Sequence, residues 1–184
     1  MKLYEGRPED VNEREEKEVR VYDMLEKLKI KYGRVDHAAA WTMEDCVAID
    51  GILGVSMCKN LFLCNRQKTD FYLLLMPSDK PFRTKELSSQ LGVARLSFAA
   101  GEDMERFLGL LPGAVSVLGL MNDTERSVRL LIDEDLRECE YIGAHPCVNT
   151  SSLKIKTEDI LKVFLPATGH TPTYVTLTGA ENIG

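Results

Sequence analysis

The sequence predicts an α+β fold, a single domain in which a mixed, mainly antiparallel sheet is flanked by short helices. Three observations lead to this prediction. The chain has 184 residues, 44% of them hydrophobic, which is enough to bury one core without disulfides or a metal. Short apolar runs are joined by polar turns, and helical segments are interspersed with them rather than strictly alternating, unlike in a doubly wound sheet. No repeat, linker or low-complexity tract divides residues 1–184.

The first third of the chain predicts two helices. Within residues 11–32, apolar residues recur at helical spacing among many charges, namely Val21, Leu25, Leu28 and Tyr32. Gly33 is a stop signal, and a loop or short strand follows to Trp41. Thr42 is a suitable N-cap before two acidic residues, so a second short helix is predicted to about Asp50.

The middle of the chain predicts a hairpin followed by two short helices. Compact apolar runs at 61–65 and 71–76 are joined by five polar residues, which indicates paired central strands. Thr84 can cap a helix that ends at Gly92, and a second helix is predicted from Gly101 to Leu108. Between these helices, a strand is predicted at 94–98.

The last third predicts a second hairpin, formed by β-rich runs at 115–120 and 128–132. After it we expect a charged short helix at 133–140, a strand or loop at 141–148 and a capped closing helix at 157–165.

Several classes of protein and site are disfavoured. The five cysteines form an odd set without a Cys-x-x-Cys pair, so we interpret them as reduced thiols. No signal-peptide core and no apolar stretch long enough to span a bilayer is visible, which favours a cytoplasmic protein without a membrane partner. Three scattered histidines make a metal site improbable, and neither common glycine-rich nucleotide motif occurs. We therefore expect no metal and no cofactor.

Charge is unevenly distributed along the chain. The net charge is −6, yet residues 57–95 contain seven basic and three acidic residues. Residues 102–140 contain four basic and ten acidic residues. The two regions could form opposite faces, one of them suited to a polyanion, or could be two ordinary solvated faces.

Three positions could carry chemistry. Lys59 lies at the mouth of a strand expected to be buried, where an ammonium can meet a phosphate or a polarised carbonyl, although lysines more often extend into solvent. Gly113 follows a proline in a turn that can expose backbone groups, although such turns usually only connect elements. His145 is flanked by Gly143 and Pro146 and could orient a substrate or a water. A thiol mechanism through Cys147 is disfavoured because no activating partner is identifiable.

Taken in order, a set of short motifs resembles one family, the prolyl-tRNA synthetase-associated, YbaK-like editing domain. The motifs are Val35-Asp36-His37 with Trp41-Thr42, Cys58 to Leu63, Arg95 to Ala99, Pro112 to Ser116 with Gly119 to Asp123, and His145-Pro146 with Asn149-Thr150. The resemblance extends from about Val21 to Leu165, and the order and spacing of the motifs are more specific than any one of them. It is closest to the free-standing deacylases that remove alanine from proline tRNA.

The resemblance implies a partly open barrel that acts in trans on a mischarged aminoacyl-tRNA. It implies catalytic roles for Lys59, Gly113 and His145, and substrate-binding roles for Thr42, Asn60 and Ser116. The loop that reads G-x-x-x-P in the family has Val117 at its last position here, and Ala38 and Ala39 stand where many relatives carry prolines.

The implied chemistry is reasonable without a catalytic triad. An aminoacyl ester is already activated, so hydrolysis needs a positioned water and stabilisation of the oxyanion more than a strong nucleophile. A prolyl site rejects alanine weakly, because missing methylenes are worth about 1–3 kcal/mol, and a second site that admits only small acyl groups supplies the remaining selectivity.

The expected partner is mischarged tRNA for proline, and a prolyl-tRNA synthetase is a candidate partner. Phosphates of the tRNA would meet the basic region through Arg66, Lys68, Lys80, Arg83 and Lys85. Two alternatives stay open: a deacylase for cysteine or another amino acid, and a non-catalytic module of the same fold that binds an amino acid or tRNA.

Overall fold

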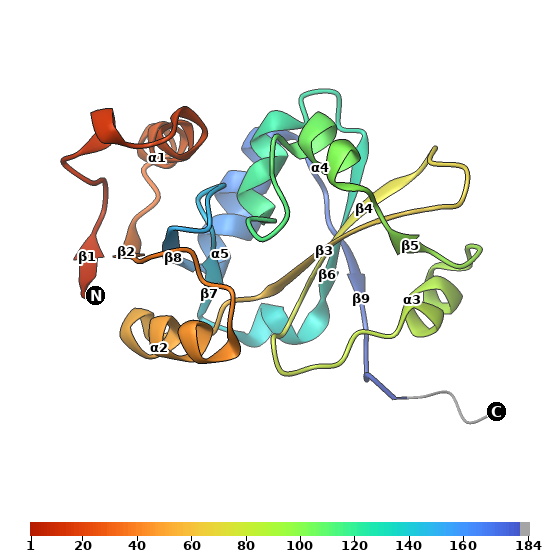
Figure 1. Ribbon diagram of the computed structural model, residues 1–184. Coiled ribbons are helices and arrows are strands. Elements are labelled where there is room, and N and C mark those ends of the chain that lie inside the picture. Colours follow the sequence, from red (N-terminus) through yellow and green to blue (C-terminus); the bar gives the residue numbers. More distant parts are fainter. Residues whose placement is uncertain (181–184) are drawn as a thin grey trace.

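A computed structural model describes residues 1–180, which form a mixed α+β domain with two sheets and several short helices (Figure 1). The fold class is therefore as predicted. The first sheet is four-stranded and antiparallel throughout, in the order β1-β2-β8-β7. Its strands are β1 (Leu3–Glu5), β2 (Tyr32–Asp36), β7 (Tyr141–Ala144) and β8 (Ser151–Lys156).

The second sheet is five-stranded and mixed, in the order β5-β3-β4-β6-β9. Its strands are β3 (Lys59–Cys64), β4 (Phe71–Met76), β5 (Ser97–Phe98), β6 (Val128–Asp133) and β9 (Thr173–Val175). The predicted hairpin of β3 and β4 is confirmed, with Lys59 opposite Met76 and Cys64 opposite Phe71. β4 is buried along its whole length, as expected of a central strand.

Helices cover the sheets. The α-helices are α1 (Glu16–Lys27), α2 (Met43–Leu53), α3 (Thr84–Leu91), α4 (Gly101–Leu108), α5 (Thr157–Asp159) and α6 (Leu165–Thr168). Shorter 3-10 segments occupy Val11–Glu13, Val117–Asn122 and Glu134–Glu138, and a π-helical turn at Ile160–Phe164 joins α5 to α6. α2 begins as predicted, because Thr42 and Asp45 form a reciprocal capping box. None of the helices within residues 1–180 combines the length and the apolar character needed to cross a bilayer.

Two apolar clusters hold the domain together, one on each face of the second sheet. The larger lies between the sheets and includes Phe62, Leu73 and Leu153, with side chains of α1 and α4. The smaller lies on the other face, where Leu63, Leu74 and other residues pack against α3. Alternate residues of β3 and β4 thus point into different clusters.

The two sheets meet at a seam but do not close into a barrel. At this seam, Met57 and Gly143 form a parallel β-bridge, and Cys58 N donates a 3.3 Å hydrogen bond to Gly143 O. A β-carbon at Gly143 would lie 2.8 Å from Met57 Sδ and 3.0 Å from Ser56 O, so only glycine fits this approach. The start of β3 is therefore held beside the end of β7.

Several local predictions are wrong. The second hairpin does not form, because Val117–Asn122 is a buried 3-10 helix and β6 pairs in parallel with β4 instead. Gly33 does not end the first helix, which stops at Lys27; it lies inside β2. Thr84 is not a cap, because its hydroxyl donates to Leu96 O.

The basic and acidic regions are not opposite faces. Lys80 Nζ lies 2.7 Å from Asp133 and 2.8 Å from Asp135, and Arg129 lies 3.0 Å from Asp70. The physical reason is the pairing of β4 with β6, which brings the two stretches of chain side by side.

Candidate functional site

Two loops meet beyond the ends of β2 and β7. Residues 37–42 follow β2, and residues 145–150 connect β7 to β8. His37 N donates to Thr150 O at 3.0 Å, and Asn149 Nδ2 donates to Ala40 O at 3.1 Å. These bonds fix the first loop to the second, so side chains far apart in the sequence line one surface.

The predicted site residue His145 lies on this surface beside His37, with ring centroids 6.4 Å apart. His145 Nδ1 lies 2.9 Å from Ser151 O, and since a carbonyl can only accept, Nδ1 carries the proton. Nε2 is then an acceptor in the neutral ring, and it has no partner within residues 1–180. Both ring nitrogens of His37 are engaged, by Ala38 O and by the Ser152 hydroxyl.

The neutral form of His145 is favoured by its surroundings. Burial lowers its pKa, the hydrogen bond to Ser151 O partly opposes this by favouring the charged ring, and the neighbouring His37 lowers it further. The net result is a pKa below the ordinary value, so His145 accepts a hydrogen bond at neutral pH.

Gly113 borders the same surface, packed against Trp41. It has a φ of +90°, and a β-carbon there would lie 2.9 Å from Trp41 Cζ3 and 3.5 Å from Asn149 Nδ2. The position therefore requires glycine for both its conformation and its space. Within residues 1–180, neither the N–H nor the carbonyl of Gly113 has a hydrogen-bond partner, so both can meet a ligand.

Lys59 and Asn60 begin β3 at the seam, but their side chains point to opposite faces of the sheet. Lys59 shares the face of Leu61 and Leu63, which belongs to the smaller cluster, whereas Asn60 shares the face of Phe62. Lys59 Nζ donates to Lys80 O at 2.6 Å. No carboxylate within residues 1–180 pairs with this half-buried ammonium, so its charge is uncompensated.

Asn60 contains an unsatisfied buried acceptor. Its Nδ2 donates to Cys58 O at 3.0 Å, which fixes the orientation of the amide, and Oδ1 is buried without a partner. An unpaired buried acceptor costs about 1–3 kcal/mol, so it needs an explanation. A donor supplied by a ligand or a water is the simplest one.

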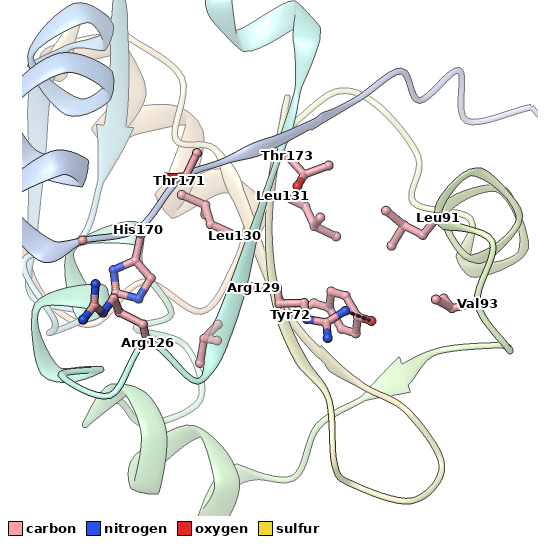
Figure 2. A pocket seen from close by; sticks show the side chains of 12 residues that line it. Tyr72, Leu91, Val93, Arg126, Arg129, Leu130, Leu131, His170, Thr171 and Thr173 are labelled. Carbon is pink, nitrogen blue, oxygen red and sulfur yellow. Dashed lines mark hydrogen bonds between the residues drawn. The ribbon is translucent and has the colours of Figure 1, made fainter.

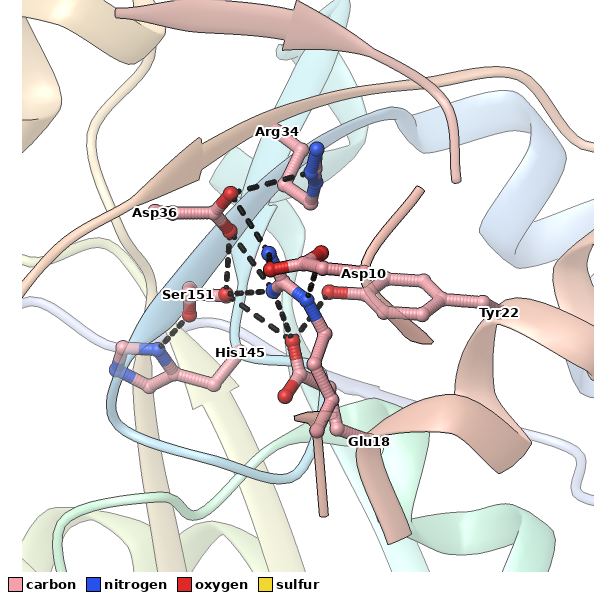
Figure 3. A network of polar contacts seen from close by, with 8 residues as sticks. Asp10, Glu18, Tyr22, Arg34, Asp36, His145 and Ser151 are labelled. Carbon is pink, nitrogen blue, oxygen red and sulfur yellow. Dashed lines mark hydrogen bonds and ion pairs between the residues drawn. The ribbon is translucent and has the colours of Figure 1, made fainter. Parts of the chain in front are cut away.

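Next to His145 lies a polar network in which most groups satisfy one another, although Arg34 Nε is buried without a partner (Figure 3). Arg14 donates to Glu18 at 2.7 Å and to Asp36 at 2.9 Å, and Ser151 Oγ donates to Asp36 at 2.8 Å. Tyr22 Oη also donates to Glu18, at 2.6 Å. Ser151 thus links α1 and β2 to the backbone carbonyl that orients His145.

Two predicted substrate-binding residues have structural contacts. Thr42 Oγ1 accepts from Asp45 N at 3.1 Å as the cap of α2, and the residue is exposed next to Trp41. Ser116 is fully buried, and its Oγ accepts from Leu118 N at 3.1 Å at the start of the 3-10 helix. The structure therefore leaves Thr42 exposed beside Trp41, whereas Ser116 is closed off from solvent.

The predicted tRNA-binding residues fall into three groups. Lys80 is compensated by Asp133 and Asp135, and Arg83 donates to Gly179 O at 3.4 Å. Lys68 lies 3.7 Å from Asp103 but is more than half exposed. Arg66 and Lys85 are exposed and have no acidic partner within residues 1–180.

A cavity of about 300 Å³ lies on the outer face of the second sheet and contains none of the predicted site residues (Figure 2). It is bordered by Tyr72, Arg126 and His170 among others. His170 is held by Asp123 and Thr168, each at 2.9 Å, so both ring nitrogens are occupied.

No cluster of three or more His, Cys, Asp or Glu side chains suited to a metal ion is found within residues 1–180. Burial raises the pKa of Cys58 and Cys147 to about 12, so neither is a ready nucleophile at neutral pH. The surface therefore offers a neutral imidazole and free backbone groups, and the start of β3 adds a buried amide oxygen on one face of the sheet and an uncompensated ammonium on the other. These groups can orient water and stabilise charge.

Sequence reasoning did not assign roles to His37, Trp41 or Asn149, although all three occur in the motifs that carry the resemblance. Their contribution depends on the meeting of two loops, and the strand β8 that creates the second loop was not predicted. A tryptophan immediately before a helix cap was the one local signal available.

Comparisons with known proteins agree on one family. The profile of the aminoacyl-tRNA editing domain matches residues 37–163. The prolyl-tRNA editing protein ProX of Acetoanaerobium sticklandii is 31% identical over 147 residues, which cover 80% of this chain and 89% of that protein. The prolyl-tRNA synthetase associated domain-containing protein 1 of Danio rerio is 32% identical over 152 residues, covering 82% of each chain.

Solved structures agree on the fold. One, described as a candidate trans-editing enzyme for prolyl tRNA synthetase, has a TM-score of 0.66 at 17% identity and covers 89% of this chain and 99% of its own. The hypothetical protein APE2540 has a TM-score of 0.62 at 16% identity and covers 84% of this chain.

Proposed function

Because the chain belongs to the aminoacyl-tRNA editing domain family, we propose that it is a trans-editing deacylase that hydrolyses the ester of alanine mischarged onto proline tRNA. The observation that carries this proposal is the Nε2 of His145, which has no partner within residues 1–180 and sits on a ring whose lowered pKa keeps it neutral; the unsatisfied buried Oδ1 of Asn60 at the start of β3 supports it. We take the whole of residues 1–184 as one editing domain of the cytoplasm.

The reaction needs no covalent intermediate. Water attacks the ester carbonyl carbon, the bond between that carbon and the ribose oxygen breaks, and the ribose oxygen takes up a proton. The products are free amino acid and tRNA. The ester is activated, so positioning and charge stabilisation supply the acceleration.

Each residue has a role that follows from its environment. His145 Nε2 accepts a proton from the attacking water or orients it, because it is an unpaired acceptor on a neutral ring. Asn60 Oδ1 accepts from a donor of the substrate or of that water. The free N–H of Gly113 stabilises the oxyanion, and Thr42 and Ser116 shape the rim and floor of the acyl site.

Lys59 is assigned to the terminal phosphate or ester region of the tRNA. Within residues 1–180 its ammonium is held only by the Lys80 carbonyl, so it can move to an anion without breaking an ion pair there. The exposed Arg66, Lys68 and Lys85 would meet phosphates farther along the tRNA, with Arg83 beside them. A prolyl-tRNA synthetase remains a proposed partner.

The decisive experiment incubates the protein with alanyl-, cysteinyl- and prolyl-tRNA for proline and measures loss of the ester. We expect rapid loss of alanine, with proline spared. Faster loss of cysteine would assign the alternative specificity. Binding of tRNA without hydrolysis of any ester would identify a non-catalytic module.

Asn60→Ala and Asn60→Asp are the matched variants for this assay. Asn60→Ala removes the amide oxygen and should lower kcat/KM by roughly 100-fold, the magnitude typical of one positioned polar group in a catalytic site, whereas Asn60→Asp keeps an acceptor oxygen and loses the amide donor. Both variants also lose the Nδ2 bond to Cys58 O, so folding is verified by circular dichroism before turnover is compared. Unchanged turnover in both variants would remove Asn60 from the mechanism.

A further inference from the structure

Trp41 is a large aromatic side chain that the fold leaves in solvent. It is 72% exposed and is the only tryptophan in the chain. Met43 and Val47 on the following helix are 80% and 67% exposed. Exposed tryptophan of this extent usually marks a binding surface, because burying the ring is strongly favourable.

The position of Trp41 is fixed rather than incidental. Its backbone lies between two anchors, the Asn149 bond to Ala40 O and the capping box that begins at Thr42. Trp41 N itself donates to Asp45 Oδ2 at 3.4 Å. The ring is therefore presented at low conformational cost, as a binding platform requires.

The benzene edge of the indole packs on Gly113. The carbon atoms Cζ3 and Cη2 lie 2.9 and 3.2 Å from the position that a β-carbon of residue 113 would occupy. Trp41 thus borders the backbone groups assigned to the ester, while most of its surface stays open. A ligand whose ester lies at Gly113 would have its adjacent group over the indole.

We infer that Trp41 is a stacking platform for the 3′-terminal nucleobase of the tRNA. This inference rests on the proposed function, since the esterified ribose carries that base directly. A planar base matches an exposed indole face, and stacking of a base on an aromatic side chain is worth enough to change affinity by roughly 5- to 150-fold. The platform binds the base whether or not an amino acid is attached.

Because Trp41 is the only tryptophan, its fluorescence reports the contact directly. The protein is titrated with uncharged tRNA for proline and with the same tRNA lacking its terminal adenosine. We expect intact tRNA to quench the emission and truncated tRNA to quench it much less at equal occupancy. Equal quenching by both would overturn the inference, as would emission that changes only with protein concentration, which would indicate a contact between copies of the chain.

Three variants complete the test. Trp41→Ala should raise KM for aminoacyl-tRNA by 5-fold or more with a smaller change in kcat, and Trp41→Phe should restore part of the loss. Met43→Ala is the matched control, because Met43 is similarly exposed but is not among the nearest neighbours of Gly113, and KM should stay within about 2-fold of wild type. A KM unchanged in Trp41→Ala, with folding verified by circular dichroism, would contradict the assignment.

The two proposals fail separately. Quenching by intact tRNA without hydrolysis of any ester would leave the platform standing and refute the deacylase. Hydrolysis of the ester without selective quenching by intact tRNA would support the deacylase and refute the stacking platform.

Discussion

Two sets of polar groups in the molecule differ in how far the chain itself satisfies them. In the first set, Arg14, Glu18, Asp36 and Ser151 satisfy one another almost completely. In the second set, Asn60 Oδ1 and His145 Nε2 have no protein partner within residues 1–180. The hydrogen bonds of the first set hold α1 and β2 to β8. The acceptors of the second set are left available to a donor outside the chain, which is what a binding site requires.

The largest effect should follow from breaking the first set. Arg14→Ala leaves the buried carboxylate of Glu18 without its cation, which should lower the free energy of unfolding by about 3 kcal/mol. Urea denaturation measures this change. Arg7→Ala is the control, because its pairs with Asp23 and Glu26 are on the surface and are worth less than about 1 kcal/mol. An equal decrease in the free energy of unfolding in both variants would show that the Arg14 network stabilises the fold no more than a surface ion pair does.

Lys59, whose ammonium pairs with no carboxylate within residues 1–180, gives the next effect: Lys59→Ala should abolish or greatly slow deacylation, by roughly 100-fold, while the melting temperature stays nearly unchanged. Lys59 loses only a bond to a carbonyl, so little stability depends on it. Lys59→Arg should also be poor, because a guanidinium fork does not replace a compact ammonium. The exposed Lys162 offers a control substitution to alanine. Near wild-type turnover in a folded Lys59→Ala protein would remove this lysine from the mechanism.

The acceptor role of His145 predicts a pH dependence with a definite sign. The pKa of His145 is below its ordinary value of about 6.5, so the ring stays neutral at pH 7 and becomes charged only on further acidification. Deacylation should therefore fall as the pH drops through this lowered pKa, because imidazolium has no acceptor. A profile of kcat/KM against pH measures it, with uncatalysed hydrolysis subtracted.

His145→Asn can keep a donor for the Ser151 carbonyl but cannot titrate. The residual kcat/KM of this variant should not fall as the pH is lowered. If the same fall at low pH persists in the variant, the titrating group belongs to the substrate or to another residue.

A smaller effect is expected from charge outside the two sets. Neutralising Arg66 and Lys68 together should weaken tRNA binding several-fold and flatten its salt dependence. Hydrolysis of a short aminoacyl-nucleotide should change little, because it lacks most of the phosphates. Lys27 and Lys31 on the α1 side provide a matched pair of neutralised controls. Equal losses on both substrates would place Arg66 and Lys68 in the pocket or the fold.

Thiol alkylation and chelation should have the smallest effect. Burial raises the pKa of Cys58 and Cys147 to about 12, whereas Cys139 is exposed and should react first. We expect full activity after iodoacetamide labels Cys139 and in the presence of EDTA. Loss of activity with EDTA that zinc restores would contradict this expectation.

The sequence predicted features governed by local chemistry. Thr42 caps α2 and the polar turn at 66–70 joins β3 to β4 because the determinants lie within a few residues. The strand predicted at 115–120 is wrong. A short continuous apolar run shows no alternation of polar and apolar residues, so its pattern cannot distinguish a buried strand from a 3-10 helix. The parallel pairing of β6 with β4 depends on long-range packing that no local pattern carries.

The candidate site shows the same division. The family resemblance supplied Lys59, Gly113 and His145 as residues, but not their arrangement. That Lys59 and Asn60 point to opposite faces follows from their register in β3, and that Trp41 packs on Gly113 follows from the meeting of distant loops. Neither fact is local to the sequence.

Several side chains of the loops around the proposed site lie outside both apolar clusters. Ala38, Ala39, Trp41 and Leu111 are exposed, so substitutions there are expected to change stability by only about 0.5 kcal/mol. These surface side chains can therefore vary while the two sheets and their seam stay intact. The architecture separates the residues that hold the fold from those that a ligand at the proposed site would meet.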